Sequence, residues 1–395
     1  MKKKIKYCSS NMKELLTEMK DTSELMVDLA YSSVIYDDED IANEVLRLEE
    51  KMDTIEYHVK IAAMLGARSY EDAAMLSGVL QAATASEKIA NAAGDIAKIV
   101  LLEMGIPLEL KFDLQEAEET IIRAKVHPKS KMVNKTLGEL KLETETGMRI
   151  IAIRRNSHWI YDPDKNTKIF AKDILFAKGY DEGVPIFYKC ATCEHYVKRV
   201  IETNYVLEDL DKAVNIIVDM KNMSELSIGL AYSSVLFYNK DLAHEVEIIE
   251  EKMDEMKYAL QHWVLKSAKY ISDVNQLRGL LHLATSSEII SDAALVIADV
   301  VLRDIELHPV LTLAVRESDE VVTKIDVSEC SDLMGKTLGE LKLETETGMY
   351  VMAIKRNDKW IYNPGSKTLI NNKDLLIARG PSSGEKLLIG MCKNR

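Results

Sequence analysis

Residues 135–148 read KTLGELKLETETGM, and residues 336–349 repeat the same letters 201 positions later. The same shift places Trp159–Tyr161 on Trp360–Tyr362, and it stays constant from about residue 13 to residue 180. No insertion therefore separates the two copies. Solenoid repeats have periods of about 20–50 residues, so this much longer period indicates one unit of several elements that occurs twice in tandem.

The repeated stretch lies in a segment of about 65 residues that predicts a small α+β module. Thr136, with Glu139 three residues later, forms a capping box at the start of a short helix, and Gly147 is a typical helix stop. Asn156–Ser157 is a two-residue hairpin turn. The second copy repeats these signals. The expected strands of the first copy are Ile121–Val126, Met148–Arg155, His158–Tyr161 and Asp173–Lys178.

The first part of each unit reads as three long helices. Apolar or small residues recur in alternating steps of four and three, which places one face of each helix in a bundle seam. In the first helix the seam residues are Leu15, Met19, Thr22, Met26, Leu29 and Ser33. Because the connections between the helices are short, the pattern predicts an antiparallel bundle.

The fold class is therefore an α+β multidomain chain in which a helical bundle and an α+β module alternate. The expected domains are a bundle over 8–106, a module over 107–182, a linker over 183–203, a bundle over 204–307 and a module over 308–390. Each unit occurs twice, so we expect the halves to pair as an intrachain pseudo-dimer, or two chains to pair as a homodimer.

Composition limits the function further. Apolar residues make up 47% of the chain and charged residues 29%, which is ordinary globular usage. The net charge of −13 argues against a nucleic-acid binder, because phosphate binding needs clustered Lys and Arg. No stretch reaches 18 consecutive apolar residues and no signal peptide is recognisable, so we expect a cytosolic protein without a transmembrane segment. The five cysteines fit reduced thiols better than a disulfide framework.

The module with KTLGELKLETETG, then IIAIRRN, WIYDP and KDILFAKG, resembles the TrkA-C domain, also called RCK-C. The match covers about residues 117–180 and 318–381. The three-helix part resembles a PhoU domain, with acidic pairs four residues apart as its markers. These pairs are Glu49 with Asp53, Glu250 with Asp254, and Glu288 with Asp292. The resemblance implies two three-helix PhoU-like bundles, each followed by a small α+β TrkA-C module.

The resemblance also implies a role. TrkA-C domains regulate transporters of potassium and other cations, usually dimerise, and in some proteins bind small ligands, including cyclic dinucleotides, at the dimer interface. PhoU-like proteins act beside phosphate transporters. The leading hypothesis is a cytosolic, non-catalytic regulatory subunit of a membrane cation transporter or channel, with potassium as the leading candidate for the transported ion. The alternative is a PhoU-like, metal-binding regulator of phosphate uptake or signalling. No G-x-G-x-x-G fingerprint is present, so a Rossmann nucleotide-binding gate is not expected.

Carboxylates on the helices are the first candidate site. Glu87 and Glu288 fall on the apolar seam of the third helix in each copy, where a carboxylate is costly unless it is paired, hydrogen-bonded or metal-bound. The PhoU resemblance implies a divalent or iron-type metal there, while the alternative is an acidic helix face or a seam Glu paired with a Lys. The candidate ligands are Glu49, Asp53, Glu87, Glu250, Asp254, Glu288 and Asp292. Asn91 stands where the second copy has Asp292, so the second copy is the better candidate.

Positive charge beside the two asparagine turns is the second candidate, a site for a small nucleotide ligand between the modules. Its residues are Arg154, Arg155, Asn156, Lys355, Arg356 and Asn357. The alternative is a solvated hairpin edge. In ligand-binding family members, an arginine that approaches the ligand phosphate aligns with Glu143 and Glu344 here, and a carboxylate at that place repels a phosphate.

The remaining motifs are weaker. Cys190-x-x-Cys193-x-His195 is a partial zinc set without an obvious fourth ligand. Gly335-Lys336-Thr337 imitates the end of a phosphate-binding P-loop, but its first glycine is missing. Nothing in the sequence assembles a nucleophile with a base, so we expect no enzyme activity.

Overall fold

The structure is a computed structural model, and the chain divides into two compact units. It describes residues 11–107, 110–111, 114, 120–156, 158–161, 163–179, 183–197, 208–269, 274–318, 320–328, 331–357, 359–362, 364–365 and 367–392. The helical unit holds residues 1–114 and 203–318, and the module unit holds residues 115–202 and 319–395. The duplicated halves are therefore interleaved, with like parts together in each unit.

The first bundle has the three predicted helices, α1 (Met12–Tyr36), α2 (Glu39–Gly66) and α3 (Tyr70–Leu101). The side chains of Asn11, Asp38 and Ser69 accept hydrogen bonds from backbone N–H groups of the first turns, which is why the helices begin there. The seam residues predicted for α1 are all buried. The four-three pattern thus identified the core face correctly.

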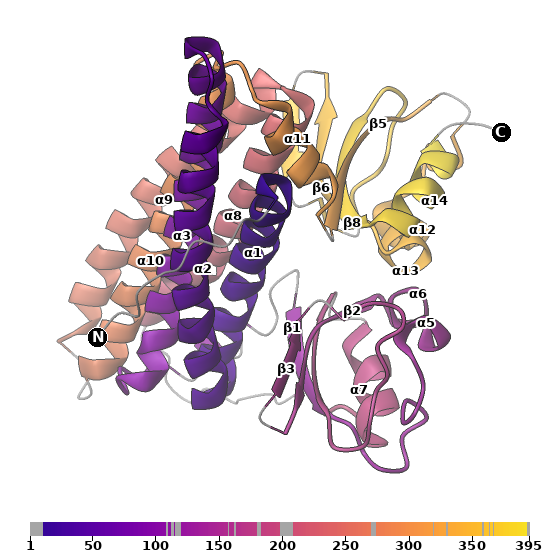
Figure 1. The fold of residues 1–395 in the computed structure, drawn as a ribbon. Coiled ribbons are helices and arrows are strands. Elements are labelled where there is room, and N and C mark those ends of the chain that lie inside the picture. The colour runs from indigo at the N-terminus through magenta and orange to yellow at the C-terminus, as the bar shows by residue number, and fades with distance from the viewer. Residues whose placement is uncertain are drawn as a thin grey trace. The chain divides into compact units, whose positions relative to one another are not determined.

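The second bundle repeats the first with α8 (Glu208–Phe237), α9 (Lys240–Ser267) and α10 (Val274–Leu302). The two bundles pack on each other through α3 and α10 (Figure 1). Gly78 near the start of α3 lies against Val300 near the end of α10, and the Asp95 carbonyl of α3 is 2.9 Å from His282 Nε2 of α10. The helices α3 and α10 therefore run antiparallel, and the helical unit has one shared six-helix core.

A short helix, α11 (Pro309–Arg316), leaves the second bundle and lies against α1 of the first. Leu311, Ala314 and Val315 are its buried face. Thr17 Oγ1 donates a hydrogen bond to the Ala314 carbonyl at 3.1 Å. The helical unit therefore extends past residue 307, where the sequence analysis placed the end of the second bundle.

The first module is a four-stranded antiparallel sheet in the order β1-β4-β2-β3. Its strands are β1 (Thr120–Lys125), β2 (Met148–Arg155), β3 (His158–Tyr161) and β4 (Ile174–Gly179). The short helices α5 (Leu137–Leu140) and α6 (Leu142–Thr146) lie between β1 and β2. Thr136 and Glu139 form the predicted capping box, and Gly147 ends α6 with a φ of 70°.

The segment predicted as a linker contains a helix, α7 (Val184–Thr192). Val184, Phe187 and Ala191 lie in the core of the first module. The segment is therefore part of the module as far as α7 reaches. Cys190 is half-buried in the last turn, whereas Cys193 and His195 are exposed beyond it.

The second module has the same topology, in the order β5-β8-β6-β7. Its elements are β5 (Glu320–Asp326), α12 (Leu338–Leu341), α13 (Leu343–Thr347), β6 (Tyr350–Arg356), β7 (Lys359–Tyr362), β8 (Leu375–Pro381) and α14 (Ser382–Cys392). Within the module unit, α13 lies against α6 of the first module. Among the described residues, no helix combines the length and the apolar character needed to cross a membrane.

Candidate functional site

The second-bundle cluster consists of the four predicted carboxylates Glu250, Asp254, Glu288 and Asp292. Glu250 and Asp254 lie one turn apart on α9, and Glu288 and Asp292 lie one turn apart on α10. The packing of α9 against α10 brings both pairs together, and the side chains of Glu250 and Asp292 are hydrogen-bonded. The second copy therefore assembles the acidic group that the sequence analysis predicted.

A lysine that the sequence analysis missed belongs to this cluster. Lys257 Nζ is 2.5 Å from Glu288 Oε1 and 3.2 Å from Asp254 Oδ1. Its side chain is only 17% exposed and that of Glu288 only 12%, so this ion pair is largely withdrawn from water. The alternative in which a seam Glu pairs with a Lys is thus realised for Glu288. The available signal was the spacing of Lys257, three residues after Asp254.

The charges of the cluster perturb one another. Burial raises the pKa of Glu250 and of Asp292, and the neighbouring carboxylates raise both further. Burial on its own lowers the pKa of Lys257, but hydrogen bonds to Glu288 and Asp254 outweigh it and leave the pKa above its ordinary value. The lysine is therefore charged at neutral pH. The raised pKa values of Glu250 and Asp292 mean that each takes up a proton more readily than an ordinary carboxylate.

The first-bundle cluster, around Glu49, Asp53 and Glu87, has different partners. Lys98 Nζ lies 3.9 Å from Glu49 Oε1, and Asn91 Nδ2 donates to Glu87 Oε1 at 2.6 Å. Burial raises the pKa of both Glu49 and Glu87, and Asp53 adds to the shift of each. The predicted carboxylates of the first copy therefore also lie near one another, held by partners from their own bundle.

The fit of a metal ion to these clusters depends on which oxygens are open to it. Among the described residues, no group of three or more His, Cys, Asp or Glu side chains is spaced to hold a metal ion. In the second bundle, Lys257 takes an oxygen of Glu288 and one of Asp254. The donor set is carboxylate, as Mg²⁺ or Mn²⁺ requires, but an ammonium group already lies within it. A metal ion therefore does not fit the cluster as it is arranged.

The second candidate site, beside the asparagine turns, has its arginines bound by the protein itself. Arg155 donates from Nε and Nη2 to the two carboxylate oxygens of Asp173, at 2.9 and 2.8 Å. Arg356 binds Asp374 in the same way, at 2.8 and 2.6 Å. Both aspartates are almost fully buried, so each arginine neutralises a charge inside its own module.

The other predicted ligand residues lie at the hairpins. Asn156 and Asn357 have φ values of 57° and 48°, the left-handed conformation that their turn requires. The Arg154 guanidinium lies 5.7 Å from the ring centroid of Trp159. Arg154 and Lys355 are half-buried on the strands that precede the turns. The aspartates were missed, although both copies keep one just before the last strand of the module.

A buried polar network joins the two bundles, and no sequence pattern predicted it. Tyr31 of α1 hydrogen-bonds Ser287 of α10 at 2.7 Å, and Tyr232 of α8 bonds Ser86 of α3 at 2.8 Å. The two contacts are equivalent under the 201-residue shift, so each copy gives a tyrosine and a serine to the other. Burial raises the pKa of both tyrosines far above the ordinary range, so both hydroxyls keep their protons.

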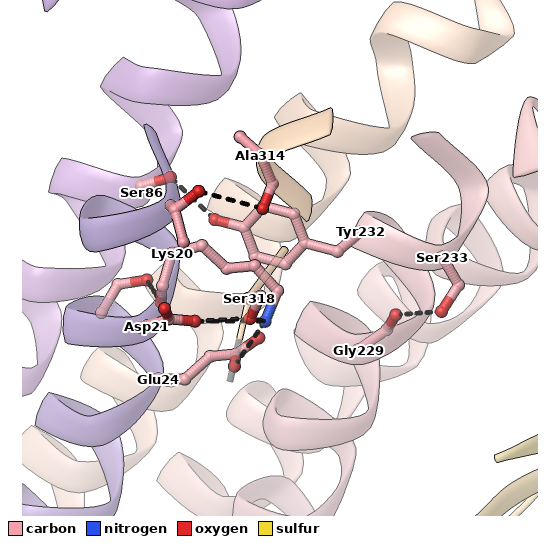
Figure 2. A network of polar contacts seen from close by, with 11 residues as sticks. Lys20, Asp21, Glu24, Ser86, Gly229, Tyr232, Ser233, Ala314 and Ser318 are labelled. Carbon is pink, nitrogen blue, oxygen red and sulfur yellow. Dashed lines mark hydrogen bonds and ion pairs between the residues drawn. The ribbon is translucent and has the colours of Figure 1, made fainter. Parts of the chain in front are cut away.

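Lys20 lies beside this network, as Figure 2 shows. Its Nζ is 2.9 Å from Glu24 Oε2, 2.8 Å from Ser318 Oγ and 5.3 Å from the ring centroid of Tyr232. Ser318 in turn donates to Asp21 Oδ1 at 2.5 Å. The lysine thus connects α1, the second bundle and the segment that leads into the second module.

Two domain families match this chain, one over the helical bundles and one over the α+β modules. The TrkA-C domain model matches residues 121–189 and 322–389, and the PhoU domain model matches residues 16–100 and 217–301. Both are regulatory, non-catalytic domain families. No curated protein matches the chain.

Among solved structures, PhoU from Pseudomonas aeruginosa is 12% identical with a TM-score of 0.40, and the match covers 74% of this chain and 96% of that one. PhoU from Streptococcus pneumoniae, a phosphate transport system regulatory protein, is 9% identical with a TM-score of 0.40, over 74% of this chain and 91% of that one. The GsuK RCK domain is 15% identical with a TM-score of 0.19, and the match covers 69% of this chain and 63% of that one. By the family models, this chain consists of two PhoU domains and two TrkA-C domains in tandem.

Proposed function

We propose that this chain is a cytoplasmic regulatory subunit of a membrane cation transporter, with potassium as the leading candidate ion. Its domain families point to a regulatory role connected with ion or phosphate transport. The observation that carries the choice is the pairing of the TrkA-C modules through α6 and α13 within one chain. Such modules usually act as dimers, and this chain supplies both partners.

The mechanism we propose is a ligand-biased equilibrium between two arrangements of the paired modules. A ligand shifts such an equilibrium only when its affinity differs between the two states. Arg154 and Lys355 are the proposed contacts for an anionic ligand. Arg155 and Arg356 support them from the same strands by neutralising buried aspartates. The helical unit is the part that meets the transporter.

The experiment that tests the partnership is affinity purification of the tagged full-length chain from detergent-solubilised native membranes, with mass spectrometry of what remains bound. A stoichiometric potassium or divalent-cation transporter is the expected result. Recovery of a phosphate transporter or sensor kinase without any cation transporter would replace the proposal by the phosphate alternative. Recovery of no transporter, with the tag alone as background, would contradict both.

A further inference from the structure

The four carboxylates of the second-bundle cluster lie close together at a half-buried position, where their mutual repulsion destabilises the bundle. Glu250, Asp254, Glu288 and Asp292 come from two helices that are in direct contact. Carboxylates this close repel one another, and the repulsion grows when burial removes the water that screens it. A folded bundle with this cluster therefore needs either protons or a cation.

The chain itself supplies a cation. Lys257 Nζ lies within ion-pair distance of Glu288, across the helix interface, and of Asp254, on its own helix. We propose that the Lys257 ammonium is the resident cation of the second-bundle cluster, so that α9 and α10 pack here without a metal ion. This inference stands apart from the proposed function, because it concerns what holds the bundle together and not which transporter the bundle meets.

The duplication offers an internal comparison. The residue equivalent to Lys257 in the first copy is Glu56, which has the opposite charge. The first bundle instead places Lys60 2.6 Å from Glu56, and Lys98 near Glu49. The two copies therefore keep an acidic cluster at the same place, and each neutralises it with lysines at positions that the other does not use.

Two further observations fit this reading. Asp292 and Glu250 are hydrogen-bonded to each other, and the charge of Lys257 also acts on Asp292, so the carboxylates that do not touch the lysine ammonium directly are held within the same cluster. In the first copy Gly94 leaves room for Glu49, since a Cβ there would lie 2.2 Å from Glu49 Oε2. The second copy has Leu295 at this position. The cluster geometry thus diverged together with the choice of lysine.

The test uses the full-length chain with Lys257→Gln, which removes the charge of the side chain, keeps a polar end and shortens the chain by one atom. We expect its unfolding temperature in EDTA to fall by about 5 °C or more, because removing one partner of a buried pair leaves the other charge uncompensated. Lys252→Gln, at an exposed position of the same helix, is the matched control and should unfold like the wild type. Equal unfolding temperatures for Lys257→Gln and Lys252→Gln would overturn the proposal.

The double variant Lys257→Gln/Glu288→Gln separates the ion pair from general damage. It removes both charges, so it should regain most of the stability that Lys257→Gln loses, and failure to regain any would count against the proposal. If Lys257→Gln does not fold, Lys257→Arg, which keeps the positive charge, should fold and should unfold near the wild-type temperature. Failure of Lys257→Arg to fold would show that the positive charge at this position is not what stabilises the bundle.

Added Mn²⁺ tests for competition at the same place. We expect Mn²⁺ to stabilise Lys257→Gln, whose cluster then lacks a cation, and to leave the wild-type unfolding temperature unchanged. A shift in the wild type that disappears in Asp292→Asn would show that a metal, and not the lysine, is the resident cation. Absence of any Mn²⁺ effect on Lys257→Gln would refute competition between lysine and metal.

Discussion

Arg155 lies one residue before a hairpin turn, where the sequence offers it to a ligand, yet its guanidinium binds a carboxylate that is almost fully buried. The position of a charged residue along a strand does not show whether its partner comes from solvent or from the next strand. The partner of Arg155 is Asp173, which lies 18 residues later in sequence on the same module. At the residue scale, the chemistry of the modules therefore depends on pairs that only the folded sheet brings together.

Arg155→Ala should destabilise the first module by about 3 kcal/mol, because it leaves the Asp173 carboxylate buried without a partner. Chemical denaturation of the full-length chain measures the change. Arg154→Ala is the control, since its cation–π contact with Trp159 is worth about 1 kcal/mol or less. If the two variants unfold alike, Arg155 does not carry a structural charge pair.

Glu250→Gln should remove one contribution to the pH dependence of the stability of the helical unit. The pKa of Glu250 is raised in the folded state, so its proton stabilises the fold below the ordinary value of 4.5, and this contribution is lost as pH rises through the folded-state pKa. Glutamine remains neutral, so the variant should gain on the wild type between about pH 5 and about pH 7. Urea denaturation at both pH values measures the gain. Glu255→Gln, an exposed neighbour, should show no such gain, and an equal gain there would contradict the assignment.

The candidate carboxylates could be predicted from sequence, because spacing of four on a helix fixes a shared face and the duplication supplied two examples. Their partners could not. Lys257 pairs with Glu288, a residue 31 positions later on the neighbouring helix, and Asn91 and Lys98 are the partners in the first copy. Periodicity gives the direction of a side chain, whereas an ion pair depends on the angle and register between helices.

At the element scale, the regular elements follow closely from local signals. The predicted strands Met148–Arg155 and His158–Tyr161 match β2 and β3, and the capping boxes are present in both copies. The short helices α7 and α11 were missed, because each is stabilised by packing of its apolar face on a distant element rather than by a long periodic pattern. Helices of this length have too few turns for the period to be read.

Gly78 and Gly279 occupy equivalent positions on α3 and α10, but they differ in what surrounds them. A Cβ at Gly279 would lie 2.0 Å from the Gly105 carbonyl oxygen, a backbone atom, while one at Gly78 would lie 3.0 Å from a methyl group of Val300. Gly279→Ala should therefore cost about 1–3 kcal/mol by overpacking. Gly78→Ala should be nearly neutral, since helix propensity gains about 1 kcal/mol and the Val300 side chain can move. Thermal denaturation compares the two, and equal losses would show that the approach of Gly105 to α10 is not rigid.

At the scale of the whole molecule, the interleaving of the halves is what the repeat alone could not show. The sequence analysis expected bundle, module, bundle and module in chain order, and pairing of the halves was one of two possibilities. The structure groups the two bundles in one unit and the two modules in the other, so the chain leaves the helical unit after residue 114, returns to it at residue 203 and leaves it again after residue 318. Before the chain leaves for the last time, α11 lies against α1, and beside it Lys13 pairs with Glu317 and Lys20 binds Ser318.

Because α3 and α10 share one core, the helical unit should unfold as a single cooperative body and not as two independent bundles. Tyr232→Phe tests this, since it removes one hydroxyl from α8 and so the hydrogen bond to Ser86 in α3, at a cost of about 1 kcal/mol. Ser86 keeps its bond to the Ala82 carbonyl, so no buried polar group is left alone there. Native-state hydrogen exchange should then show the same loss of protection in α1–α3 as in α8–α10.

Tyr31→Phe, the equivalent change in the other copy, should give the same pattern with the roles of the bundles exchanged. If each variant loosens only the bundle in which it lies, the two copies fold separately and the reciprocal tyrosine–serine contacts do not bind them into one body.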